Sequence, residues 1–306
     1  MLRYTLKRFL SMLITLFLVA TATFFQMHAI PGQPFEITRE TPESVRIALE
    51  QEYGLDKPVW QQYLIYMNNL LHGEFGTSMK YKGQTVMGEV ANGMPVSAII
   101  GFGGVLVGCL IGSVLGCLAA LKNKGFVDYF VIVLAILGVS VPNFVFGSLI
   151  QRFFAVEWGL FPIQGWRGWS YAVLPIAAAA FTNIAHYARM LRTSMLDTMG
   201  QDYIYTARSK GLSQNEIVRK HMMRNSFLPL VTSLGPMCAG VLTGNFVIEK
   251  IFNIPGIGKS MILAIQNSDY TMIMGLTIIF SFISIICYFL VDIVYGLVDP
   301  RIRIAK

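Results

Sequence analysis

The chain has 306 residues, of which 54% are apolar and only 13% are charged. Because the apolar residues occur in long runs, this composition excludes an ordinary soluble globular domain and predicts a membrane protein. The formal net charge of +7 would also suit nucleic-acid binding. The basic residues, however, concentrate in short segments between the apolar runs, which is typical of membrane topology signals.

Six apolar runs are long enough to cross the hydrocarbon core of a bilayer, which takes about 20 residues of helix. They lie near residues 9–30, 97–121, 127–153, 172–191, 227–248 and 272–297. If the N-terminus is inside the cell, the inner segments hold most of the basic residues, seven of them from Arg189 to Arg224. The positive-inside rule therefore predicts an all-α protein with six transmembrane helices and both termini in the cytoplasm.

Residues 1–30 are predicted to form a short basic tail and the first transmembrane helix. The small residues Val19-Ala20-Thr21-Ala22 would also fit the cleavage site of a signal peptide. The apolar run continues as far as Met27, beyond the roughly 7–15 residues of a signal-peptide core, which favours an uncleaved span.

A polar insert, residues 31–96, separates the first two spans, and its excess of acidic over basic residues indicates that it faces the outside. We expect two short helices in it. One runs from Pro42 to Gly54 and the other from Pro58 to Gly73, with apolar residues along one side of the second. The insert is either an inert extracellular cap or a contact surface for a delivery partner, and the sequence leaves both possibilities open.

The second span carries glycine at every fourth position, which allows another helix backbone to approach closely within a membrane. The predicted helix-packing residues are Gly104, Gly108, Gly112 and Gly116. Proline in the third and fourth spans, Pro142 and Pro175, predicts kinks in these helices.

The sequence contains no reactive cluster. The four cysteines lie inside apolar runs without metal-ligand spacing. The centres of the spans are nearly free of ionisable residues, which argues against a proton-coupled transporter that works alone. Gly258-Lys259-Ser260 imitates the end of a phosphate-binding loop, but Asn253 stands where the leading glycine belongs. We therefore expect no catalytic residue, no metal site and no cofactor.

The only substantial cytoplasmic loop has the features of a small helical docking element. Asp202 is expected to cap a helix that ends before Gly211 at its C′ position. Ser213 and Glu216 have capping-box spacing for a second helix. Ala207 and the bare glycine would permit close approach by a partner surface, whereas the alternative is a stabilised surface loop.

This loop, about residues 193–226, resembles the EAA loop of ATP-binding-cassette importer permeases, in the version found in peptide permeases. Ala207 and Gly211 match the second alanine and the glycine of that motif. Tyr205 stands at its glutamate and Thr206 at its first alanine, departures that resemble the peptide and nickel branch. Further segments similar to that branch are Tyr53–Pro58, Gly76–Lys82, Val247–Gly258 and Val298–Arg301.

The resemblance covers nearly the whole chain and is closest to the oligopeptide branch. It implies a type I importer permease with a five-helix core at residues 97–297 and a cytoplasmic tail at 298–306. The ATPase-coupling residues that it implies are Asp202, Tyr205, Thr206, Ala207, Arg208, Lys210, Gly211 and Leu212. The implied outer gate or binding-protein contacts are Glu249, Pro255, Gly256 and Gly258.

By the same resemblance, the chain would form half of an alternating-access pathway for oligopeptides in the bacterial inner membrane. The implied partners are a second homologous permease subunit, two cytoplasmic ATPases and an extracytoplasmic peptide-binding protein, within a lipid bilayer and without nucleic acid. The chain itself would have no ATPase site. The alternatives are a dipeptide, nickel or glutathione permease of the same family, or an autonomous secondary transporter.

Overall fold

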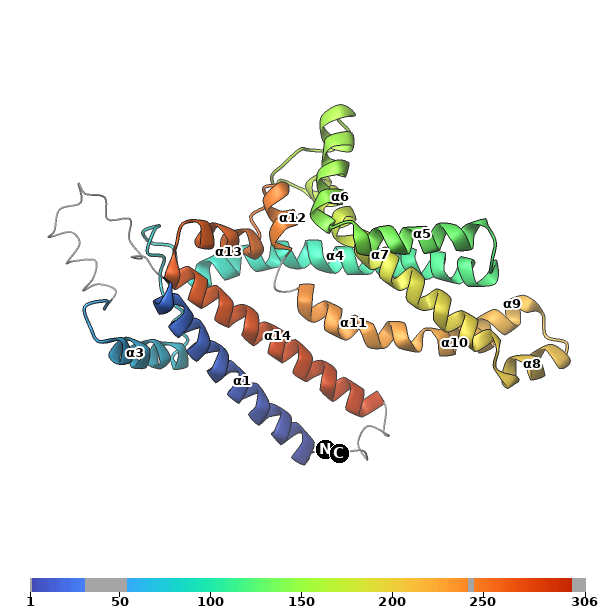
Figure 1. Cartoon of the computed structure of the whole chain (residues 1–306), viewed down its shortest axis with the longest axis horizontal. Helices are drawn as coiled ribbons and strands as arrows, with labels where there is room; N and C mark the ends of the chain where they lie inside the picture. Colours follow the sequence, from blue (N-terminus) through green and yellow to red (C-terminus); the bar gives the residue numbers. More distant parts are fainter. Residues whose placement is uncertain (1, 31–53, 242–244, 299–306) are drawn as a thin grey trace.

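The computed structural model describes residues 2–30, 54–241 and 245–298, which form helices and no β-strand (Figure 1). The all-α class is therefore confirmed. The first short helix expected in the insert, from Pro42, lies outside the described residues, as do residues 299–306 of the tail.

The number of membrane spans stays a prediction. Within the described residues, the helices that are long and apolar enough to cross a membrane are Thr5–Ala29, Val86–Leu121 and Tyr270–Leu290, with a bent helix pair as a fourth candidate. The expected fourth and fifth spans do not meet the same test. The fourth is long enough but carries several polar residues, and the fifth is described for only 14 residues.

The first and last long helices, α1 (Leu2–Ala29) and α14 (Tyr270–Val298), lie side by side and run in opposite directions (Figure 1). Large apolar side chains along α1, such as Leu10 and Phe17, are more than half exposed. Exposed apolar side chains on a long helix are expected where lipid surrounds it.

The short helix α3 (Val59–Leu71) lies where the sequence places the second helix of the insert. It rests on the end of α1, where the Nε2 of His28 lies 3.0 Å from the Oε1 of Gln62 and the Oγ1 of Thr21 lies 2.8 Å from the Oη of Tyr63. No residue of α3 is fully buried, so its apolar side is only partly covered.

Helices α4 (Val86–Leu121) and α7 (Trp169–Met199) run parallel and form the centre of the molecule (Figure 1). The four glycines of α4 face α7: they are Gly104, Gly108, Gly112 and Gly116, and all are buried. A Cβ added to Gly104 would lie 2.6 Å from the Cβ of Ala179, closer than real side chains approach. The glycines therefore bring the two helices into backbone contact. Pro175 lies inside α7, which continues past it.

We expect Gly112→Ala to destabilise the fold by about 1–3 kcal/mol, because overpacking forces the two helices apart. A Cβ there would lie 2.8 Å from both the carbonyl oxygen of Ile184 and the Cβ of Tyr187. The matched control is Gly147→Ala, a buried helical glycine whose added Cβ would meet the Cβ of Ala178 at an ordinary 3.4 Å. Thermal unfolding of the purified variants measures both, and equal melting temperatures would contradict the packing role.

The expected third span is not one kinked helix. α5 (Phe126–Ser140) ends two residues before Pro142. α6 (Asn143–Ile150) starts directly after the proline, at a bend of 105° from α5, and continues into the π-helical turn η1 (Gln151–Glu157). The proline lacks an N–H and disfavours helical geometry in Val141, whose φ of −92° and ψ of 117° are extended. The prediction placed the break at the correct residue, but it underestimated the angle of the bend.

Shorter helices complete the fold, with α11 packed along α14, α4 and α7 and the others at the two ends of the bundle. They are α8 (Asp202–Ser209), α9 (Gln214–Glu216), η2 (Ile217–Met222), α10 (Met223–Ser226), α11 (Leu228–Val241), α12 (Phe246–Ile251) and α13 (Ile257–Gln266). α4, α7 and α14 start at the end that carries α13, and α4 and α7 finish near α8. We call these the α13 end and the α8 end. The start of α1 and the finish of α14 both lie away from the α13 end, and the cytoplasmic placement of the termini stays a prediction.

Candidate functional site

Helix α8 begins after Gln201 rather than after Asp202. The N-cap residue is Gln201, with extended φ and ψ of −84° and 146° and no side-chain capping bond. Asp202 is the first helical residue, where a carboxylate still interacts favourably with the positive end of the helix dipole. The sequence misplaced the cap by one residue because aspartate is the preferred capping type and glutamine is not.

Helix α8 ends in a Schellman motif at Gly211, whose φ is +77°. The N–H of Leu212 donates to the carbonyl of Ala207 at 3.3 Å, and the N–H of Gly211 donates to the carbonyl of Arg208 at 2.9 Å. A Cβ added to Gly211 would meet nothing within 4 Å. The glycine is thus required for its left-handed backbone rather than for space.

The second helix of the loop starts with the expected capping box. The Oγ of Ser213 accepts from the N–H of Glu216 at 3.4 Å, and the Glu216 carboxylate accepts from the Ser213 N–H at 3.3 Å. The pKa of Glu216 lies below its usual value. The main cause is the hydrogen bond from the Ser213 backbone N–H, and the second is the hydrogen bond from Lys220. These local bonds fix the direction of the backbone after the end of α8.

The inner face of α8 packs against the body of the molecule. Ile204 and Ala207 are buried in a cluster with Leu191, Met195, Ile217, Val218 and Met222. The expectation that Ala207 meets a partner surface therefore does not hold in this structure, because its small side chain faces the cluster. Sequence reasoning missed Ile204, although its spacing of three residues from Ala207 marks one helix face.

The outer face of α8 presents polar and aromatic side chains. Of the predicted coupling residues, Asp202, Tyr205, Thr206, Arg208, Lys210 and Gly211 are exposed, and Leu212 is half-buried against the cluster. The Tyr205 side chain is 55% exposed. Neither Arg208 nor Lys210 forms an ion pair with a residue that the structure describes. α8 thus combines a rigid buried base with a free cationic and aromatic surface.

A buried ion pair ties α7 to the start of α5 at the α8 end. The Nη2 of Arg192 donates to the Oδ2 of Asp128 at 2.9 Å, and its Nε donates to the Oδ1. The Asp128 side chain is 2% exposed and also accepts from the N–H of Lys124 at 2.8 Å. Sequence reasoning missed this pair, because 64 residues separate the partners.

At the α13 end, Glu249 is fully buried at 0% exposure. Its Oε1 accepts from the Oγ of Ser97 at 2.7 Å and from the N–H of Asn245 at 3.1 Å, and its Oε2 accepts from the N–H of Lys259 at 3.0 Å. The Oγ of Ser97 in turn accepts from the N–H of Ile257 at 2.9 Å. One carboxylate therefore caps α12 and α13 and joins them to α4. We call these contacts the Glu249 clamp.

The predicted outer contacts divide between the clamp and the surface. Gly256 and Gly258 are buried, and a Cβ on Gly258 would lie 2.9 Å from the Cδ1 of Phe246. Glu249, Gly256 and Gly258 face the interior of this chain, which does not fit direct contact with a binding protein, and their part in an outer gate stays a prediction. Only Pro255 is exposed. The N–H of Lys259 binds the Glu249 carboxylate, so an internal anion occupies the start of α13.

A second buried carboxylate, Asp269, holds the start of α14. It is 1% exposed and accepts from the Oγ of Ser78 and, at 3.1 Å, from the N–H of Met79. The Oη of Tyr81 also accepts from Asn267 at 2.9 Å. The turn that follows α3 is thus fixed to the segment between α13 and α14. Sequence reasoning missed Asp269, although an aspartate directly before an apolar run is a cap signal.

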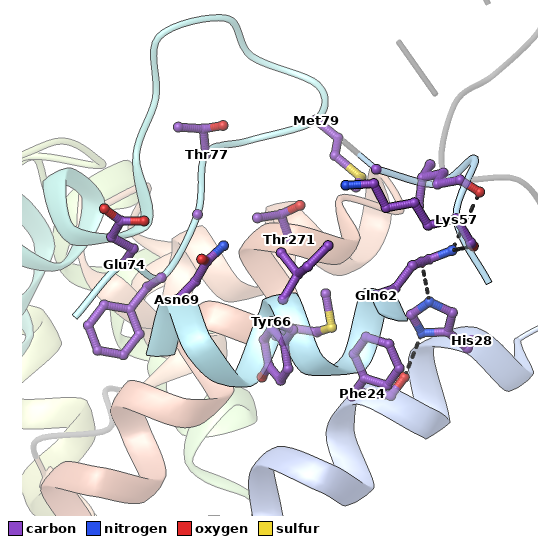
Figure 2. A pocket seen from close by; sticks show the side chains of 16 residues that line it. Phe24, His28, Lys57, Gln62, Tyr66, Asn69, Glu74, Thr77, Met79 and Thr271 are labelled. Atoms are coloured by element: carbon purple, nitrogen blue, oxygen red, sulfur yellow. Dashed lines mark hydrogen bonds between the residues drawn. The ribbon is translucent and has the colours of Figure 1, made fainter. Parts of the chain in front are cut away.

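A cavity of about 320 Å³ lies between the end of α1, α3 and the start of α14 (Figure 2). Its lining mixes apolar and polar side chains, and Lys57 and Glu74 lie at opposite ends of it (Figure 2). Bonds within the chain already engage His28 and Gln62. The Oη of Tyr66 has no hydrogen-bond partner among the described residues, and burial, with the neighbouring Tyr63, raises the pKa of Tyr66. The described residues contain no cluster suited to a metal ion.

Two family models match this sequence. The model of the binding-protein-dependent transport system inner membrane component matches residues 112–304, and the model of the N-terminal part of such membrane components matches residues 1–98. Together they account for nearly the whole chain.

Known proteins are similar over their full length. The dipeptide transport system permease protein of Bacillus subtilis is 45% identical over 306 residues, covering 100% of this chain and 99% of the relative. The corresponding protein of Lactococcus lactis is 42% identical, covering 99% and 100%. The oligopeptide transport system permease protein of Salmonella typhimurium is 38% identical, also covering 99% and 100%.

A solved structure shares the fold. The crystal structure of an amino acid ABC transporter with histidines superposes with a TM-score of 0.53 at 14% identity, covering 67% of this chain and 92% of that chain. At this identity the likeness concerns the arrangement of helices alone.

Proposed function

The chain belongs to the family of inner-membrane components of binding-protein-dependent transport systems, and we propose that it forms one half of the pathway of a peptide importer. Permease subunits of such importers work with ATPases and a binding protein. In the proposed assembly, a second homologous permease supplies the other half, two ATPases bind at the α8 end, and the binding protein delivers peptide at the α13 end. The ATPases hydrolyse ATP, and this chain has no catalytic residue of its own.

The observation that carries this proposal is the construction of α8. Its free face, with Tyr205, Arg208 and Lys210, is suited to a groove on an ATPase surface. Its opposite face is buried in a cluster that includes residues of both η2 and α7, so a displacement of α8 would be passed to α7 through this cluster. The Asp128–Arg192 pair extends the same connection to α5.

We further propose that the Glu249 clamp acts as a support at the α13 end. It holds α12 and α13 so that Pro255 and the exposed side chains of α13, Leu263 and Ile265, keep one orientation. This surface and the neighbouring Tyr81 suit contact with a binding protein or an outer gate. The clamp residues would then affect delivery only through the surface that they position.

Peptide is the proposed substrate because the full-length relatives are named as peptide permeases. The dipeptide permeases named above are more similar than the oligopeptide permease, at 45% and 42% against 38% identity. We therefore propose dipeptides as the first substrate class to test, with longer peptides second. Nickel and glutathione, which the sequence resemblance also allowed, serve as competing solutes in the same assay.

The test is Arg208→Glu in the complete transporter, reconstituted into proteoliposomes with its ATPases and binding protein. We expect ATPase affinity and ATP-driven dipeptide uptake to fall at least tenfold, because one charge in a docking groove changes sign. The matched control is Arg167→Glu, an exposed arginine outside α8, which should leave both unchanged. Normal ATPase binding and uptake by Arg208→Glu would contradict the docking role. Uptake by this chain without an ATPase would favour the autonomous transporter.

A further inference from the structure

One face of α7 carries polar side chains from the middle of the helix toward the α8 end. These residues are Thr182, His186, Arg189 and Thr193, spaced by four, three and four positions. This spacing places all four on one side of an α-helix, because residues three and four apart lie on the same face. We call them the polar stripe.

The polar stripe lies away from the side of α7 that packs on α4. The side against α4 includes Ile184 and Tyr187, at helical positions roughly opposite the stripe. Arg189 and Thr193 are exposed. At the other end of the stripe, the half-buried Thr182 donates a hydrogen bond to Asn143, directly after the break at Pro142. Two of the four members, Arg189 and Thr193, thus face outward from this chain.

Two members of the polar stripe have polar side-chain groups that lack a partner among the described residues. The Nε2 of His186 is buried and has no hydrogen-bond partner there. Arg189 forms no ion pair with a described residue, although its guanidinium is exposed. An exposed cation without an ion-pair partner is suited to an anionic ligand.

Lipid alone does not account for the polar stripe. An arginine can extend its long side chain to the membrane surface, but histidine and threonine are too short to do so. Polar residues within a span usually face the bundle interior or a water-filled cavity. α7 also fails the apolarity test that α1, α4 and α14 meet. The stripe therefore points toward an aqueous space.

We propose that the polar stripe lines the translocation path and that Arg189 binds the carboxylate of a passing peptide. This inference rests on the proposed function and adds to it a contact for the substrate. A guanidinium can hold a carboxylate through two parallel hydrogen bonds.

The first test measures whether the stripe faces water. In a chain whose four native cysteines are replaced, Thr193→Cys in the complete complex in nanodiscs should react with a water-soluble anionic thiol reagent. The control is Leu118→Cys, an exposed apolar residue of α4 near the same end of the bundle as Thr193, which should react at least tenfold more slowly. Equal rates at the two positions would overturn the assignment of the stripe to an aqueous path.

The second test measures carboxylate binding by protection of Thr193→Cys. Without a binding protein, a saturating dipeptide should slow labelling at least tenfold more than the same dipeptide with an amidated C-terminus. Arg189→Ala should abolish this difference, Arg189→Lys should retain part of it, and the control Arg167→Ala should retain all of it. Equal protection by the two peptides, or unchanged protection in both Arg189 variants, would overturn the proposal.

Two further outcomes are distinguishable from carboxylate binding: lipid binding by Arg189 and failure of the proposed function. If Arg189→Ala changes labelling only in nanodiscs with anionic lipid, and equally for both peptides, Arg189 binds lipid phosphate and the proposal fails. ATP-driven uptake by the wild-type complex with its binding protein is measured separately. A wild-type complex that imports no peptide would reject the proposed function, whereas the labelling data concern the stripe alone.

Discussion

Replacing Glu249 with alanine is expected to destabilise the folded chain by about 3–6 kcal/mol, among the largest effects of any single substitution. The change leaves the Ser97 hydroxyl and the N–H groups of Asn245 and Lys259 without their acceptor in a fully buried site. Each unsatisfied buried donor costs about 1–3 kcal/mol. We expect a lower yield of monodisperse protein and a lower melting temperature, measured by heating followed by size-exclusion chromatography.

Two variants separate the Glu249 clamp from a general effect of removing an acid. Glu157→Ala removes a carboxylate that is 39% exposed and paired with Arg152 at 3.1 Å, and it should cost less than about 1 kcal/mol. Ser97→Ala removes one donor together with its acceptor function, so its effect should lie between the two. A Glu249→Ala variant that melts with the wild type would show that the clamp contributes nothing to stability.

The clamp also shows where sequence reasoning reached its limit. The resemblance selected Glu249, Gly256 and Gly258 as important, and the structure gives them close mutual packing. Their burial inside the chain was not predictable, because the partner of Glu249, Ser97, lies 152 residues away in the chain. A spacing pattern within one segment carries no information about which remote helix covers that segment.

Local signals were more reliable than remote ones in the loop that carries α8. The turn at Gly211 and the capping box of Ser213 and Glu216 depend on residues three to five positions apart, so the sequence specifies them directly. Ala207 illustrates the opposite case. A small residue indicates a close approach but does not say whether the approaching surface belongs to a partner or, as here, to the chain itself.

At the break at Pro142, the sequence predicts the position of the break but not its angle. The missing N–H and the extended residue before the proline are readable from the sequence, and they place the end of α5 correctly. The angle between the two helices depends on how α6 packs on α7, through the rings of Phe146 and Phe181 at 4.0 Å. Tertiary packing therefore turned an expected kink into a bend of 105°.

Arg192→Ala is expected to destabilise the fold by about 2–3 kcal/mol, because it leaves the Asp128 carboxylate buried with only the N–H of Lys124 as a partner. The estimate lies at the low end for buried pairs because the Arg192 side chain is 21% exposed and solvent screens part of its charge. Thermal unfolding of the purified chain measures this cost, and ATPase stimulation by the binding protein measures any loss of coupling between α8 and α5.

The double variant Asp128→Leu with Arg192→Met distinguishes the charge pair from simple packing. Removing both charges and keeping the volume should restore most of the stability lost in Arg192→Ala, because no unpaired buried charge is left. Coupling should recover with it if the pair only holds α7 against α5. Restored stability together with defective ATPase stimulation would instead mean that the charges themselves act in transmission. A double variant as unstable as Arg192→Ala would contradict the unpaired-charge explanation.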